Sequence, residues 1–172
     1  MGEFLTRAFV WIALLGYSVS SVRQLNQMSP TATRRWWVMG AVAFVLHVAF
    51  AFHVFHDWSH VAALKETAKQ TKELTGVSSG SGLYLNYVFT LIWVVDAIWW
   101  HVVGHERYAR RVKWVPIAIH VFFIFMIVNG AIVFGKGPVR WYGGVLVAMM
   151  LVAMMLVAFI LRKRGSSVEG MS

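Results

Sequence analysis

The stretch WWVMGAVAFVLHVAFAFHVFHDW, residues 36–58, decides the fold class of this chain. It contains no lysine, arginine or glutamate, and its ionisable side chains are three histidines and one aspartate. About 20 helical residues are needed to cross the ~30 Å hydrocarbon core of a bilayer, so this stretch is long enough. It predicts a transmembrane helix.

Four further apolar blocks accompany it, at residues 4–22, 83–103, 114–134 and 141–161. They are continuous, whereas the strands of a membrane barrel would alternate over ~10 residues, and helices satisfy their own backbone in lipid. Only 13% of the chain is charged, against about 25% in a soluble domain. We therefore expect an all-α fold: a polytopic bundle of about five transmembrane helices, forming a single domain over residues 1–172.

Residues 59–74 are mostly helix formers and contain no glycine or proline, and a run rich in glycine and serine follows at 76–82. This pattern predicts a short extramembrane helix and then a flexible turn into the third block.

The lysines and arginines lie in clusters between the blocks, six on one side of the predicted membrane and ten on the other. The side with more positive charge is usually cytoplasmic. We expect a multi-pass protein of the cell inner membrane, with its N-terminus outside and its C-terminus in the cytoplasm. The net charge of +9 then reflects topology, and no nucleic-acid partner is expected.

The first block also resembles a secretory signal peptide, because Arg7 precedes a short apolar run that ends in Ser18-Val19-Ser20. Cleavage would leave four helices. It would also place Arg34 and Arg35 outside, against the charge count, so an uncleaved first helix is the simpler prediction.

Ionisable residues within the apolar blocks are the main functional signal, because such groups are costly in a membrane. The candidates for cofactor binding are His47, Asp96, His101 and His120. At a rise of 1.5 Å per helical residue, we expect His47, Asp96 and His120 in the same half of the bilayer. A pair formed by His101 and His120 on adjacent helices is the alternative. Hydrogen bonds between helices would explain the same residues without a cofactor.

His53, His56 and His60 form a second group, whose spacing places them on one face of a continuous helix near the outer surface. Imidazole nitrogens bind zinc, copper, iron and nickel, so this group is a candidate metal site. The alternative is that all three are amphipathic residues in the headgroup region.

Three functional hypotheses follow, and no motif names a reaction, so enzymatic activity stays undecided. The first is a redox membrane subunit that binds b-type haem through histidines on facing helices, an arrangement that resembles the small membrane-anchor cytochromes of respiratory complexes. Its partners would be the lipid bilayer and other membrane subunits.

The second hypothesis is a membrane metalloenzyme with a His-ligated transition metal. His56 with His60 and His101 with His105 are His-x-x-x-His pairs, similar to the histidine boxes of di-iron membrane hydroxylases and desaturases. The chain has no adjacent His-His pair, however, and its two pairs are predicted on opposite membrane faces.

The third is a non-catalytic protein, either an accessory subunit or a proton or metal conduit.

The chain has no cysteine, which excludes disulfides, thiolate metal sites and iron–sulfur clusters.

Overall fold

The structure, a computed structural model, describes residues 1–133, 141, 144–145 and 148. Every regular element in that part of the chain is a helix, so the all-α prediction is confirmed there. The helices are α1 (Gly2–Leu25), α2 (Pro30–His56), α3 (His60–Thr75), α4 (Ser81–Ala109) and α5 (Trp114–Ile127), and a π-helical segment, Val128–Val133, continues α5. The predicted span at 141–161 falls almost wholly outside the described residues.

Three of these helices, α1, α2 and α4, are long and apolar enough to cross a membrane. They contain 24, 27 and 29 residues. The apolar helix over Trp114–Gly130 is shorter.

The helices extend further than the apolar blocks. Helix α2 begins at Pro30, six residues before the predicted span, because proline is well accommodated in the first turn of a helix and the polar residues after it are compatible with helix. Helix α4 is interrupted at Gly104, directly after the predicted block, and a further helical segment continues to Ala109. Hydropathy locates the lipid-embedded part of a helix, and the helix itself ends where its backbone is capped or broken.

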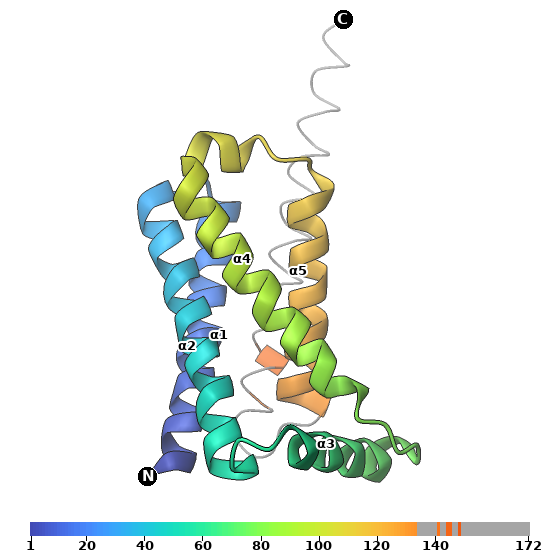
Figure 1. The fold of residues 1–172 in the computed structure, drawn as a ribbon. Helices are drawn as coiled ribbons and strands as arrows, with labels where there is room; N and C mark the ends of the chain where they lie inside the picture. Colours follow the sequence, from blue (N-terminus) through green and yellow to red (C-terminus); the bar gives the residue numbers. More distant parts are fainter. Residues whose placement is uncertain (134–140, 142–143, 146–147, 149–172) are drawn as a thin grey trace, which may run out of the picture. The chain divides into compact units, whose positions relative to one another are not determined.

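Helices α1 and α2 run antiparallel and side by side (Figure 1). Small residues make their close approach possible, because a Cβ atom on Gly16 would lie 2.7 Å from the Cα atom of Gly40. Ala13, Gly16 and Ser20 follow one another at spacings of three and four and are buried on α1. Such seams of small residues are typical of helices that pack in membranes.

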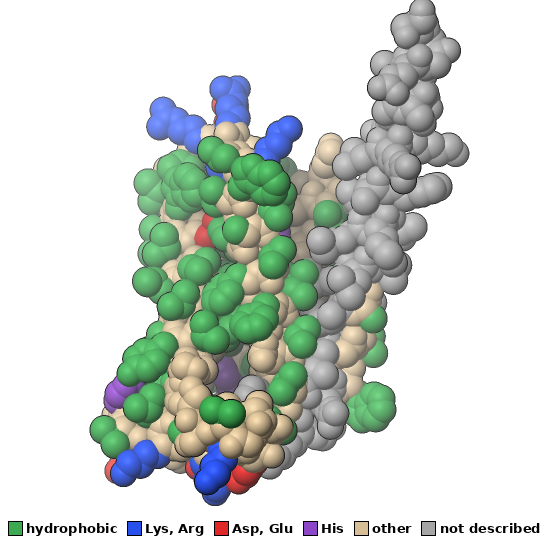
Figure 2. All heavy atoms as spheres, turned by 90° about the vertical axis from the view of Figure 1, so that its right-hand side faces the viewer, with side chains coloured by type: hydrophobic (Ala, Val, Ile, Leu, Met, Phe, Trp, Pro, Cys, Tyr) green, Lys and Arg blue, Asp and Glu red, His purple; other side chains and the backbone are tan. Residues whose placement is uncertain are grey.

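The two long faces of α4 are both apolar but differ in burial. Phe89, Trp93, Asp96 and Trp100 occupy one face and are at most 4% exposed. Leu91, Val95, Ile98 and Val102 occupy the opposite face and are 54–75% exposed. A soluble protein rarely exposes an apolar stripe of this length. Figure 2 shows hydrophobic side chains over the middle of one face, with lysine and arginine at both ends.

Helix α3 lies across the end of the bundle where α2 stops and α4 begins (Figure 1). The chain turns at Asp57 and Trp58, which both have positive φ angles, and the Ser59 hydroxyl then caps α3 by accepting a hydrogen bond from the backbone of Ala62. Gly76 ends α3 in a left-handed conformation. The chain as a whole divides into two compact units, Met1–Met126 and Ile127–Ser172.

Candidate functional site

Asp96 lies on the buried face of α4 with only 3% of its side chain exposed, and both of its oxygens are engaged. The Tyr108 hydroxyl donates to Oδ2 at 2.7 Å. The Arg111 guanidinium donates to Oδ1 at 2.6 Å and is itself only 6% exposed. Asp96 is therefore one member of a buried ion pair.

A kink at Gly104 makes this contact possible. Its φ of 77° and ψ of 171° interrupt the helical backbone of α4 and redirect the residues that follow. A left-handed φ is accessible to glycine at little cost. The kink allows Tyr108 and Arg111 to fold back onto Asp96.

Three planar groups stack beside the ion pair. The rings of Trp100 and Tyr108 lie 4.2 Å apart and 5° from parallel. The Arg111 guanidinium lies on the Tyr108 ring, 3.8 Å from its centroid. This stack, with the Asp96 contacts, fastens the segment after the kink to the body of α4.

His120 connects α5 to α1, because its Nδ1 atom lies 3.1 Å from the Tyr17 hydroxyl. Both rings belong to an aromatic cluster at the centre of the first unit. Its other buried members, Trp37, Trp93 and Phe123, are at most 2% exposed. Aromatic side chains thus fill the interior around His120.

His47 connects α2 to α1. Its Nδ1 atom lies 2.8 Å from the backbone carbonyl of Thr6, and its ring packs on Phe44 at 5.6 Å. A carbonyl can only accept, so Nδ1 carries the proton and Nε2 presents a lone pair.

The structure does not bring the predicted metal group onto one helix. His53 and His56 lie in the last turn of α2, packed against Trp58 and Phe52, respectively, whereas His60 begins α3. The intervening turn places His60 on a different helix from His53 and His56, and His60 instead pairs through Nδ1 with the Tyr87 hydroxyl at 3.0 Å. Among the described residues, no cluster of three or more His, Asp or Glu side chains is arranged to hold a metal ion.

His101 and His105 differ in their surroundings although both are exposed. His101 precedes the kink, on the part of α4 that bears the exposed stripe. His105 follows the kink, and its ring centroid lies 6.5 Å from that of Trp100.

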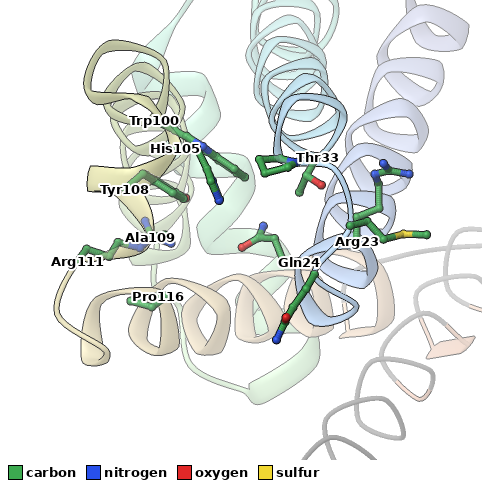
Figure 3. A pocket seen from close by; sticks show the side chains of 12 residues that line it. Arg23, Gln24, Thr33, Trp100, His105, Tyr108, Ala109, Arg111 and Pro116 are labelled. Carbon is green, nitrogen blue, oxygen red and sulfur yellow. The ribbon is translucent and has the colours of Figure 1, made fainter.

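A pocket of about 440 Å³ opens beside Trp100 and His105. Figure 3 shows Trp100, His105, Tyr108 and Arg111 on one wall and Arg23, Gln24 and Thr33 on the opposite wall. The pocket therefore lies where α1 ends, α2 begins and α4 bends. Sequence reasoning assigned Arg23 and Arg111 only to the loops, although Gly104, directly after an apolar block, is a common signal for a helix break.

Comparisons with protein-family models, curated proteins and solved structures found no match for this chain.

Proposed function

We propose that this chain is a polytopic integral membrane protein that acts as a non-catalytic subunit, in which His47 and His120 join helices and the buried Asp96 fastens the kinked end of α4. The observation that carries the proposal is that the buried carboxylate of Asp96 is satisfied by the protein's own Arg111 and Tyr108. His47 and His120 support it, because each forms a hydrogen bond to α1. In a membrane, a hydrogen bond between helices satisfies polar groups that would otherwise have no partner in the hydrocarbon, and it thereby favours helix association. Other membrane subunits and the lipid bilayer would be its partners.

The arrangement in the membrane is part of the proposal. Five crossings would place the N-terminus outside and the arginine-rich end, which holds Arg23, Arg35 and Arg110, in the cytoplasm of a cell with an inner membrane. Helix α3 would then lie on the outer surface. The exposed apolar stripe of α4 would face lipid.

Cysteine labelling tests the topology cleanly, because the chain has no cysteine of its own. Ser78→Cys lies between α3 and α4, and Lys113→Cys lies between α4 and α5, both at exposed positions. A membrane-impermeant maleimide should label the first variant in intact cells and the second only after permeabilisation. Labelling of both in intact cells would refute the predicted orientation.

The subunit role is tested by Asp96→Asn and His120→Phe, with His101→Ala as the exposed control. We expect the first two to lower the amount of protein that accumulates in membranes and the control to leave it unchanged. The purified wild-type protein should show no stoichiometric metal and no haem absorption in its reduced-minus-oxidised spectrum. A haem band lost in a histidine variant would reject the non-catalytic role.

A redox subunit with b-type haem or a transition metal is the second candidate. One observation favours it. The Nδ1 atom of His47 is hydrogen-bonded to the Thr6 carbonyl, so the lone pair of Nε2 can bind a metal ion, as in typical ligating histidines. His47→Ala and His120→Ala, measured for bound haem or metal per protein, would identify the ligands if a chromophore is present.

A further inference from the structure

The pocket, which is lined from α1, α2, α4 and the start of α5, is amphipathic. Arg23, Arg111 and Trp100 contribute hydrogen-bond donors to its lining, while Met28 and Pro116 contribute apolar surface. No carboxylate side chain lines it within the described part of the chain. A cavity with this composition favours a ligand in which an anionic group is attached to a less polar group.

Two of its donors are buried and have no partner. The Nε atom of Arg23 and the indole nitrogen of Trp100 are inaccessible to solvent and form no hydrogen bond. Trp100 is 2% exposed, and Figure 3 shows its side chain on the wall that faces Thr33. Trp37 and Trp93 also have unpaired indoles, but other aromatic rings enclose them. Trp100 is distinguished by lining the cavity.

The two arginines of the pocket have different electrostatic roles. Arg111 is neutralised by Asp96 at 2.6 Å. The described residues show no acidic partner for Arg23, and the exposed side chains of Arg107, Arg110 and Lys113 belong to the neighbouring end of α4 and the turn after it. A concentration of one sign of charge around a cleft raises the local concentration of the opposite ion.

We propose that this pocket binds a phosphate group, supplied either by the headgroup of an anionic phospholipid or by free phosphate. A phosphate accepts several charge-assisted hydrogen bonds, which would satisfy Arg23 and Trp100 together once the two side chains turn toward the pocket. Basic pockets between transmembrane helices on the cytoplasmic side are suited to anionic headgroups, and Met28 and Pro116 would contact the glycerol region. The proposal is independent of the subunit role, and its test measures ligand binding rather than assembly.

The experiment uses the full-length protein in detergent, with binding followed by native mass spectrometry and by thermal unfolding. One arm compares phosphatidylglycerol with phosphatidylcholine. The other compares inorganic phosphate with chloride at equal ionic strength. Selectivity for phosphatidylglycerol alone identifies a lipid site, and saturable phosphate binding identifies a site for the free ion.

Arg23→Gln should weaken binding of the preferred probe by about tenfold or more, because it removes a charge-assisted hydrogen bond. Arg35→Gln is the matched control, since Arg35 is exposed at the same end and does not line the pocket. Its effect should be less than about twofold, as expected for an exposed, screened charge. If Arg23→Gln does not fold, Trp100→Phe keeps the ring stack, removes the N–H donor and should weaken binding severalfold.

Equal losses in the Arg23 and Arg35 variants would overturn the proposal, since they would indicate diffuse surface attraction. Absence of binding to both phosphatidylglycerol and inorganic phosphate would overturn it as well. If Arg23→Gln does not fold and Trp100→Phe leaves binding unchanged, the proposal is overturned too.

Discussion

The guanidinium of Arg111 lies 2.6 Å from the carboxylate of Asp96, fifteen residues earlier in the chain. Both side chains are nearly inaccessible to solvent. Two charges removed from water tolerate burial only as a pair with further hydrogen bonds, which Tyr108 supplies here. The stability of the kinked end of α4 therefore depends on a contact between groups that are distant in sequence.

Asp96→Asn leaves the Arg111 charge buried without its counter-ion. Breaking a buried ion pair in this way costs about 3 to 5 kcal/mol. We expect a loss of that order in the free energy of unfolding, measured in mixed detergent micelles. Glu106→Gln removes an exposed carboxylate from the same helix and should change the free energy by less than about 0.5 kcal/mol. Equal effects of the two substitutions would show that the pair is unimportant.

Gly104→Ala tests the kink. A Cβ atom at this position would meet no other atom within 4 Å, so any effect arises from the positive φ. A φ of 77° with a ψ of 171° lies in a region that only glycine adopts readily, and forcing alanine into it costs about 1 to 3 kcal/mol. Gly130→Ala is the control, because its Cβ also meets open space and its φ is not in the positive range. Thermal unfolding should distinguish the two, and a Gly104 variant as stable as the control would argue against the kink.

Gly16→Ala tests the seam between α1 and α2. The new Cβ atom would lie 2.7 to 2.9 Å from backbone atoms of Gly40 and Trp36, which cannot move without separating the helices. Overpacking of this kind costs about 1 to 3 kcal/mol. Gly82→Ala should be tolerated, since its nearest contact is a Thr67 methyl group at 3.4 Å. The free energy of unfolding checks both, and comparable losses would contradict the close approach.

Tyr17→Phe removes the hydroxyl that pairs with His120 but retains the aromatic ring and its packing. A double-mutant cycle with His120→Phe should yield a coupling free energy of about 0.6 to 2 kcal/mol, the range for hydrogen bonds between membrane helices. A coupling near zero would mean that the two side chains contribute independently through packing.

Part of the candidate site could be predicted from the sequence. The apolar surroundings of His47, Asp96 and His120 identified them as buried polar groups, and all three have polar partners in the structure. The partners themselves were missed. Thr6 contributes a backbone carbonyl and Tyr17 an interior hydroxyl, and neither carries a sequence signal that would associate it with a particular histidine.

The sequence by itself determined that the described chain is helical, because helix formation follows from local backbone preferences and side-chain hydropathy. It predicted about five apolar spans, and three helices of the described residues are long and apolar enough to cross a membrane. Only the tertiary structure decided that His60 belongs to a separate helix from His53, and that Arg111 pairs with Asp96. Both depend on backbone turns, at Asp57 and Trp58 and at Gly104, that redirect the chain. Arg111, which the sequence places in a charge cluster between two apolar blocks, therefore has a nearly buried side chain.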